Sequence, residues 1–422
     1  MSSVITATLR PPTWLRPVRI LGLLIVTGVL VRLALALVHP LTFPDSLDYL
    51  HLASRIENGQ SYRVTGMYAK RLPGYPVFMA CVLITDGGHK LGILVWQAII
   101  SGWMIYLAWR LGSLVDSIVG LLSAALTALD PLLIGFAASY LTETLFTALF
   151  LCTLLIFARW CQQPQNKLLP VLLAALFTID VYVRAEIALC IFPLLAWYVL
   201  ALEGKGRARR VLVSCFVLLM ILAGMMPWWV RNWEIFHSNF FRFSTLEGIS
   251  LYESVYHGAT GGPRQSDIKW PAYMKKLNES QRDNRWTAMS FAIIRHHPWR
   301  ILRLAFVKIC RTWSPWLHAK GYRSMWVNIV LSLWYVAEYV LAFLGLLHLR
   351  RRGPWLLFGI TVIPILYLTA MHALFLGSVR YRVPLIPLVG ILAAVGLRNV
   401  LGAWIQSNHP AASTGGSSAV VE

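Results

Sequence analysis

The sequence predicts an all-α polytopic membrane protein, with about ten transmembrane helices and further interfacial helices in two large outer loops. Hydrophobic residues make up 57% of the 422 residues, and charged residues make up only 13%, about half of the share in a typical soluble domain. Long apolar runs recur along the whole chain, and Lys and Arg cluster between alternate runs. The expected spans are about 18–39, 91–110, 117–136, 144–160, 168–182, 186–202, 211–229, 326–347, 354–372 and 384–404.

The basic residues predict which side of the membrane each loop occupies. Arg10, Arg16 and Arg19 precede the first span and place the N-terminus in the cytoplasm. That span is long and no small-residue cleavage pattern follows it, so we expect a retained helix rather than a signal peptide. With ten crossings, the basic clusters at 203–210 and 350–352 fall on the same side, which supports the count.

The first outer loop, about 40–90, carries two carboxylates close to the end of the first span. Residues 45–58 have helical apolar spacing, which would place Asp45 and Tyr49 on one face. Asp45 follows a proline, so a simple N-cap is an equally good interpretation at this point, and we expect Asp48 to be solvated. The apolar segment 73–85 is too short to cross and is expected to be re-entrant or interfacial.

A second acidic residue, Glu143, stands at the outer end of the span 144–160. A first-turn glutamate also favours the helix dipole, so its position alone does not establish a role. The pair Asp130-Pro131, near the end of the preceding span, is expected to end a helix there.

Several basic residues fall on the outer side, where the positive-inside rule gives no reason for them. Each could anchor its helix by extending to the interface. As a set they favour a phosphate-bearing lipid as partner, because arginine donates forked hydrogen bonds to phosphate and keeps its charge. The candidates for substrate binding are Lys70, Arg71, Arg184, Arg231, Asn232, Arg380 and Arg382.

The second large outer loop spans about 230–325, and its segment 296–316 has the spacing of an amphipathic surface helix. We therefore expect one membrane domain over 1–404. Residues 405–422 are polar and rich in Gly and Ser, and we expect a disordered cytoplasmic tail.

The net charge of +20 does not indicate a nucleic-acid partner, because many of the basic residues lie in short linkers between apolar runs, as the positive-inside rule requires. The six cysteines show no C-x-x-C spacing and mostly lie within apolar runs, so we expect reduced packing residues. No metal-ligand motif is present in the sequence, and the mechanism expected below needs no cofactor, although it leaves a divalent cation open.

A series of motifs appears in one order along the chain: "PDSLDYLHLASRIENG", "KRLPGYPVFMA", "YLTETLF", "YVRAEIALCIFPL", "MPWWVRNW" and "RYRVPLIPLVGILAAVGL". Over about residues 18–404 this resembles the C-type membrane glycosyltransferases that use polyprenyl-phosphate sugars, in the branch of protein mannosyltransferases and lipid A aminoarabinose transferases. The resemblance implies a multi-helix fold with an extracytoplasmic active site.

The resemblance also implies roles for single residues. The family's catalytic aspartate maps onto Asp45 and its second acidic position onto Glu143, while Arg380 and Tyr381 match its "RY-x-x-P" pattern. The family often has an acidic pair where this chain has Asp45-Ser46, so the role of the second acid is left open. Members with a large C-terminal outer domain differ from this sequence, which ends soon after its last span.

The expected reaction is an inverting transfer of a sugar from a polyprenyl-phosphate donor, with Asp45 as general base and the arginines holding the leaving phosphate. Acceptors could be a lipid, a glycan, a protein or water. We expect a bacterial inner membrane, with both termini cytoplasmic. A secondary transporter or flippase for lipid-linked substrates is the alternative, followed by a ligase that uses lipid-diphosphate sugars, but the polar residues gather on one side and no repeat appears.

Overall fold

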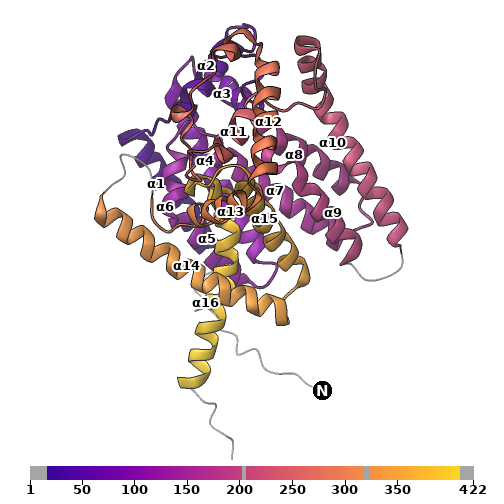
Figure 1. Ribbon diagram of the computed structural model, residues 1–422. Coiled ribbons are helices and arrows are strands. Elements are labelled where there is room, and N and C mark those ends of the chain that lie inside the picture. Colours follow the sequence, from indigo (N-terminus) through magenta and orange to yellow (C-terminus); the bar gives the residue numbers. More distant parts are fainter. Residues whose placement is uncertain (1–16, 202–205, 318–323, 409–422) are drawn as a thin grey trace, which may run out of the picture.

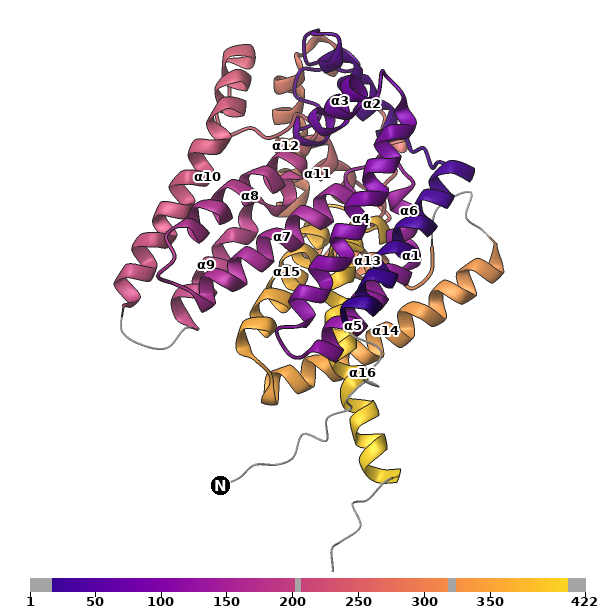
Figure 2. The same ribbon diagram turned by 180° about the vertical axis from the view of Figure 1, so that it is seen from behind.

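The computed structural model describes residues 17–201, 206–317 and 324–408, and its regular secondary structure in these ranges is helical apart from two isolated bridges. Figures 1 and 2 show α2, α3 and α12 gathered at one end of the molecule, whereas α16 runs out at the opposite end. The predicted all-α membrane fold is confirmed, and the chain is an integral membrane protein.

Seven segments are long and apolar enough to cross a bilayer. An eighth crossing is possible if two helices, which meet at a bend of 55°, form one broken span. The seven are α1 (Pro17–Val38), α4 (Lys90–Gly112), α7 (Glu143–Gln162), α10 (Arg207–Phe236), α14 (Met325–Arg352), α15 (Trp355–Leu374), and η4 (Val379–Leu385) continued by α16 (Ile386–Asn408); the bent pair is α5 (Ser117–Leu129) and α6 (Pro131–Ala137).

The bend between α5 and α6 has a local cause. Asp130 ends α5, and its carboxylate accepts a hydrogen bond of 2.8 Å from the Leu133 backbone N–H at the start of α6. Pro131 then occupies the first helical position, where its missing N–H costs nothing. The expectation that Asp130-Pro131 ends a helix is therefore confirmed.

The predicted spans 168–182 and 186–202 form shorter apolar helices: α8 (Leu168–Val183), and η1 (Ala185–Cys190) continued by α9 (Ile191–Leu200). Both are shorter than the roughly 20 residues that a perpendicular crossing needs. The ten-crossing count therefore depends on these two segments, and the predicted side of each loop stays a prediction.

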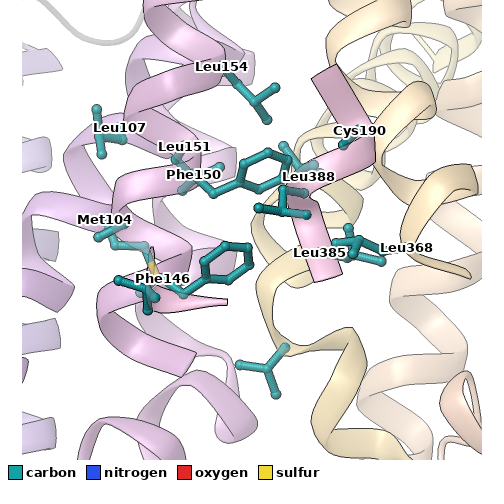
Figure 3. Close-up of a cluster of buried hydrophobic side chains, with 14 of the residues drawn as sticks. Met104, Leu107, Phe146, Phe150, Leu151, Leu154, Cys190, Leu368, Leu385 and Leu388 are labelled. Carbon is teal, nitrogen blue, oxygen red and sulfur yellow. The ribbon is translucent and has the colours of Figure 1, made fainter. Parts of the chain in front are cut away.

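The hydrophobic core is centred on α7, which lies among the other helices rather than at their edge. Figure 3 shows side chains of α7 meeting those of α4, η1, α15, η4 and α16. The labelled residues of this cluster are Met104, Leu107, Phe146, Phe150, Leu151, Leu154, Cys190, Leu368, Leu385 and Leu388. Because Glu143 is the first residue of α7, this packing fixes the position of its carboxylate.

The outer loops fold into short helices. The first loop contains α2 (Pro44–Glu57) and α3 (Gly74–Thr85), and the second contains α11 (Glu247–Val255), η2 (Gln265–Asp267), η3 (Ala272–Lys276), α12 (Glu279–His296) and α13 (Pro298–Thr312). Residues 237–296, called the outer helical unit below, have a small core of their own: Ile249, Ile268, Met274 and Trp286.

Hydrogen bonds from backbone and side-chain groups join the outer helical unit to the first outer loop. The Thr245 N–H donates to the Ala69 carbonyl at 2.9 Å, and the Ser244 hydroxyl donates to the Lys70 carbonyl at 3.0 Å. The Tyr68 N–H donates to the Glu279 carboxylate at 2.8 Å. The segment of the first outer loop that carries Lys70 and Arg71 is therefore held in place by the second outer loop.

The two segments predicted to lie at the interface are helical. Residues 73–85 form α3, and the segment 296–316 contains the amphipathic helix α13. On α13 the side chains of Trp299, Leu302 and Phe306 are exposed, whereas Lys308 is buried and donates to the Leu374 carbonyl at 3.0 Å. The predicted tail, 405–422, begins as the last residues of α16, and its remainder, 409–422, lies outside the described residues.

Candidate active site

Asp45 lies in the first turn of α2 but does not cap it. The N-cap is Phe43, and the Ser46 hydroxyl accepts a hydrogen bond of 3.1 Å from the Phe43 N–H. Pro44 occupies a first-turn position where a missing N–H is tolerated. The N-cap interpretation of Asp45 is therefore wrong, and Ser46 has a structural role at the start of α2.

Both carboxylate oxygens of Asp45 are paired with arginines from distant parts of the chain. Arg71 Nη2 lies 2.5 Å from Oδ1, and Arg380 Nη1 lies 2.6 Å from Oδ2. Burial alone would raise the pKa of Asp45, but the two guanidinium groups outweigh it and lower the pKa from 3.8 to about 2. The side chain keeps 31% of its surface exposed, so a substrate can reach it.

Glu143 is fully buried, and Arg380 connects it to Asp45. The Nε of Arg380 pairs with Glu143 Oε1, and Arg184 Nη1 lies 3.3 Å from the same oxygen. Among the described residues, Glu143 Oε2 has no hydrogen-bond partner. A buried carboxylate oxygen without a partner is costly, which makes this atom a candidate for binding a hydroxyl group of a substrate.

Further ion pairs extend the network on both sides. Arg184 Nε lies 2.8 Å from Glu186 Oε1, and Lys70 Nζ lies 2.8 Å from Asp48 Oδ1. Asp48 is therefore a buried ion-pair partner, and the expectation that it is solvated is wrong. We call the whole set the charge cluster. Its four carboxylates and four cations balance: Asp45, Asp48, Glu143 and Glu186 with Lys70, Arg71, Arg184 and Arg380.

Aromatic rings border the charge cluster. Arg71 lies over the ring of Tyr49, 5.3 Å from its centroid, and Tyr49 packs edge-on against Tyr75. Tyr381 stacks on His372 with centroids 4.4 Å apart, and His372 Nε2 is 3.8 Å from Glu186 Oε1. Tyr49 and Tyr381, both predicted to bind substrate, therefore lie beside the cluster, whereas Glu186 and His372 were not among the predicted site residues.

Three predicted binding residues have other partners. Arg231 donates to the carbonyls of Tyr62 and Tyr68 at 3.1 and 3.0 Å, and to the Asn232 side chain at 2.8 Å. Asn232 donates to the Arg242 carbonyl at 3.2 Å. Arg231 and Asn232 therefore connect α10 to the backbone of the two outer loops.

Arg382 is the third of these residues. It is 1% exposed, packs over the Tyr335 ring at 4.3 Å and donates to the carbonyls of Thr312 and Ser314. These contacts fix η4, the element that also carries Arg380, to the end of α13.

A cavity of about 850 Å³ has Arg380 among its lining residues. Most of its wall comes from apolar side chains of the loop before α2, of α6 and of α14, whereas Arg311 and the pair Arg264–Asp267 add charged groups. Its apolar lining includes Leu41, Phe43, Pro131, Leu132, Phe136, Leu317, Val327 and Leu331. The cavity therefore has the amphipathic lining that suits a ligand with an anionic head and an apolar tail.

Among residues 17–201, 206–317 and 324–408, no three His, Cys, Asp or Glu side chains are grouped so as to hold a metal ion. The carboxylates of the charge cluster are instead paired with Lys and Arg side chains. The donor set therefore does not by itself identify a metal, and no step below is assigned to one.

Comparisons with known proteins agree with the fold and with the motifs. Residues 71–230 match the family model of dolichyl-phosphate-mannose-protein mannosyltransferase. The archaeal oligosaccharyltransferase AglB from Archaeoglobus fulgidus, solved with an inhibitory peptide and a dolichol-phosphate, superposes with a TM-score of 0.52 and 13% identity. The match covers 93% of this chain and 51% of AglB, so this chain spans about half the length of that protein.

ArnT from Cupriavidus metallidurans, solved with undecaprenyl phosphate, is also similar, at 14% identity and a TM-score of 0.43 over 92% of this chain and 79% of ArnT. No curated protein sequence matches this chain. The family match and the shared fold with AglB confirm the resemblance to the C-type membrane glycosyltransferases that the sequence motifs predicted.

Proposed function

We propose that this protein transfers a sugar from a polyprenyl-phosphate donor to an acceptor on the extracytoplasmic side of the membrane. The observation that carries the proposal is the position of Arg380, which pairs with both Asp45 and Glu143 and also lines the amphipathic cavity. One cation thus connects a possible base, a possible hydroxyl-binding group and a possible lipid site. We infer cytoplasmic termini from the distribution of basic residues, and we place the protein in a bacterial inner membrane as part of this proposal.

The donor's isoprenoid chain would lie along the apolar wall of the cavity, and its phosphate would meet Arg380 at the polar end. A planar guanidinium can donate two parallel hydrogen bonds to phosphate oxygens. Arg311 lines the same cavity and supplies further positive charge, whereas Arg264 lies 3.9 Å from Asp267, which also lines it. This assignment accounts for arginines in a cavity whose wall is largely apolar.

In the proposed reaction, an acceptor hydroxyl or amine attacks the anomeric carbon of the sugar from the face opposite the phosphate. The new bond forms as the bond between the anomeric carbon and the phosphate oxygen breaks, so the configuration inverts. Asp45 takes the acceptor's proton, which is worth about 10²–10⁴-fold in rate for a well-placed base. The leaving polyprenyl phosphate needs cations rather than a proton, and Arg380 and Arg71 are adjacent to the base.

The low pKa of Asp45, about 2 in the unliganded protein, makes it a weak base in that state. We infer that the donor itself corrects this. When the phosphate takes hydrogen bonds from Arg380, it weakens the pairing with Asp45 and adds a negative charge nearby. Both effects raise the pKa of Asp45. The base would therefore gain strength only when a donor is bound, which limits unproductive proton transfer.

Glu143 is assigned to the orientation of substrate. Its Oε1 orients Arg380 and Arg184, and its unpartnered Oε2 can accept a hydrogen bond from a hydroxyl of the sugar or of the acceptor.

The proposal is tested with the purified full chain in liposomes and radiolabelled polyprenyl-phosphate sugars. A transferase releases free polyprenyl phosphate and labels an acceptor from a membrane extract. A transporter or flippase would move the intact donor across the bilayer without cleaving it. Recovery of intact, translocated donor as the sole product would overturn the proposal.

The same assay tests the cavity as the lipid site. Gly135 lines the cavity, and a Cβ built there meets nothing within 4 Å, so Gly135→Trp would add bulk at the cavity wall. We expect at least tenfold weaker use of a long-chain donor, with a smaller effect on a short-chain analogue. Gly22 in α1 has equally open surroundings outside the cavity, and Gly22→Trp is the matched control.

A further inference from the structure

A second cavity, of about 310 Å³, lies in the outer helical unit. It is bounded by the segment that follows α10, by the start of α11 and by α12, and it shares no residue with the charge cluster. Its volume is at the lower end of the range of small-molecule sites, about 300–1,000 Å³. The cavity is large enough for a small polar ligand.

The floor of this cavity is a buried and neutralised ion pair. Arg242 and Asp283 are 4% and 5% exposed and pair with each other. Arg242 Nη2 also donates to Asn284 Oδ1 at 2.6 Å, and the Gly248 N–H donates to Asp283 Oδ1 at 2.6 Å. Since the charge of Arg242 is already balanced, the floor does not attract phosphate. Arg242 Nε is buried and has no hydrogen-bond partner among the described residues.

The rim combines exposed aromatic rings with planar polar groups. Phe241 and Phe291 line the cavity and are 68% and 61% exposed. Asn239, Glu247 and Asn284 line it too. Within the part of the chain that the structure describes, the amide nitrogens of both asparagines and Oε2 of Glu247 form no hydrogen bond, whereas Glu247 Oε1 accepts from the Ser244 N–H at 3.1 Å.

The backbone at the entrance is held in an unfavourable conformation. His237 and Asn239 have φ angles of 47° and 29°, in the left-handed region that non-glycine residues seldom adopt. Ser238 between them is fixed to α12 by a hydrogen bond of 2.5 Å between its hydroxyl and that of Ser280. His237 is the C-cap of α10, and this turn places Asn239 and Phe241 at the wall of the cavity.

We propose that this cavity binds a saccharide ring. A sugar presents hydroxyl groups that both donate and accept, and these match free amide donors and a free carboxylate acceptor. It also presents a face of C–H groups that can pack on an aromatic ring, which explains two large exposed phenyl rings at a polar cavity. A phosphorylated ligand is disfavoured, because Arg242, the single cation that lines the cavity, is already neutralised by Asp283.

The location connects this site to the proposed function and names the acceptor class, so this part of the inference rests on that function. The outer helical unit that forms the cavity is hydrogen-bonded through Thr245 and Ser244 to residues 69 and 70, next to Arg71 of the charge cluster. A glycan held in the cavity would lie beside the loop that carries Arg71. The acceptor would therefore be a glycan, held through one of its more distant rings.

The test measures binding of methyl α-mannopyranoside and methyl β-N-acetylglucosaminide, each separately, to the full chain in lipid nanodiscs by saturation-transfer NMR. We expect Phe291→Ala and Asn284→Ala to weaken binding by about five- to tenfold each, as for loss of one stacking contact or one hydrogen bond. Tyr273, an exposed aromatic residue of the same unit, does not line the cavity, and Tyr273→Ala should bind as the wild type does.

Absence of binding to the wild type, or equal binding by Phe291→Ala, would overturn the inference, as would a serine-rich peptide that binds when neither glycoside does. Donor cleavage measured on the same preparations separates the two proposals. A protein that binds glycosides but never cleaves a polyprenyl-phosphate sugar contradicts the proposed function alone. A protein that cleaves the donor and binds no glycoside contradicts the saccharide site alone.

Discussion

Replacing Arg380 by lysine is the most informative perturbation of the charge cluster, because this side chain uses two different nitrogens for two carboxylates. Nη1 pairs with Asp45 at 2.6 Å, and Nε pairs with Glu143. Lysine keeps the positive charge but presents a single ammonium, which cannot reproduce the planar fork. Arg380→Lys therefore separates the requirement for charge from the requirement for geometry.

The expected magnitude follows from the loss of one charge-assisted hydrogen bond to the leaving phosphate. Such bonds are worth about 1.5–3 kcal/mol, so kcat/KM for the donor should fall by roughly 10- to 150-fold. Arg380→Ala removes both bonds and the charge, and should cost on the order of 10³-fold or more. It also leaves buried Glu143 with Arg184 alone, at 3.3 Å. The double variant Arg380→Ala/Glu143→Gln therefore serves as the folding control for the alanine substitution.

The assay is release of labelled polyprenyl phosphate at several donor concentrations. Arg398 provides the matched control: it lies in α16 beyond the η4 segment that carries Arg380, and it is paired with Asp116 at 2.5 Å. Arg398→Lys should cleave the donor at the wild-type rate. If Arg380→Lys also did so, or if both variants lost activity equally, the assignment of Arg380 to the phosphate would be refuted.

Four further predictions use the same preparations. Because the base must be ionised, activity is lost as pH falls through the pKa of Asp45, which is about 2 without donor and should rise toward or above 3.8 with donor bound. On acidification, kcat, which reports the donor complex, should therefore fall at a higher pH than kcat/KM, which reports the free enzyme. If the two pH–rate profiles fell at the same acidic pH, donor-driven activation would be contradicted. Glu143→Gln keeps the shape but removes the charge that orients Arg380, so transfer should fall by about 10²-fold, and full transfer in acceptor-labelling assays would remove Glu143 from the site. Arg231→Ala removes two hydrogen bonds to the loop carbonyls of residues 62 and 68 and should lower the free energy of unfolding by about 2–4 kcal/mol. Thermal unfolding should then show a lower Tm, and an unchanged Tm would show that the loop is held by other contacts. Gly135→Trp should impair long-chain donors more than short ones, and an effect independent of chain length would argue against the cavity as the lipid site.

The general architecture could be predicted from the sequence because hydrophobicity and charge are local signals. Apolar runs marked the spans, and the Asp130-Pro131 pair marked the break between α5 and α6. The amphipathic spacing of residues 296–316 predicted α13. The crossing number was less certain, because α8, and η1 with α9, have the apolar composition of spans but not the length.

The partners of the polar residues depend on the tertiary fold and were harder to predict. Asp45 and Arg380 are 335 residues apart in the sequence and 2.6 Å apart in the structure. Their proximity was expected from the shared outer side and from the family resemblance. No local signal distinguished Arg380, which enters the cluster, from Arg382, which packs on Tyr335 two residues later. A turn of the 3₁₀ helix η4 directs these two side chains to different surroundings.

Asp48 and Glu186 belong to the charge cluster but were not predicted from the sequence to be site residues. Asp48 was expected to be solvated. It is instead 8% exposed and paired with Lys70 and Arg71. Glu186 follows Arg184 in the sequence and pairs with it at 2.8 Å. The signal available was charge balance: four basic residues gathered at a membrane rim require nearby carboxylates.

The most direct measurement of the central claim compares Asp45→Asn with Asp48→Asn in a single-turnover assay of polyprenyl-phosphate-sugar cleavage. Both substitutions remove one carboxylate that pairs with Arg71, so they perturb the charge of the cluster equally. The account predicts that Asp45→Asn loses at least about 10²-fold in rate, while Asp48→Asn remains within about tenfold of the wild type. Comparable rates for the two variants, or a wild-type rate for Asp45→Asn, would contradict it.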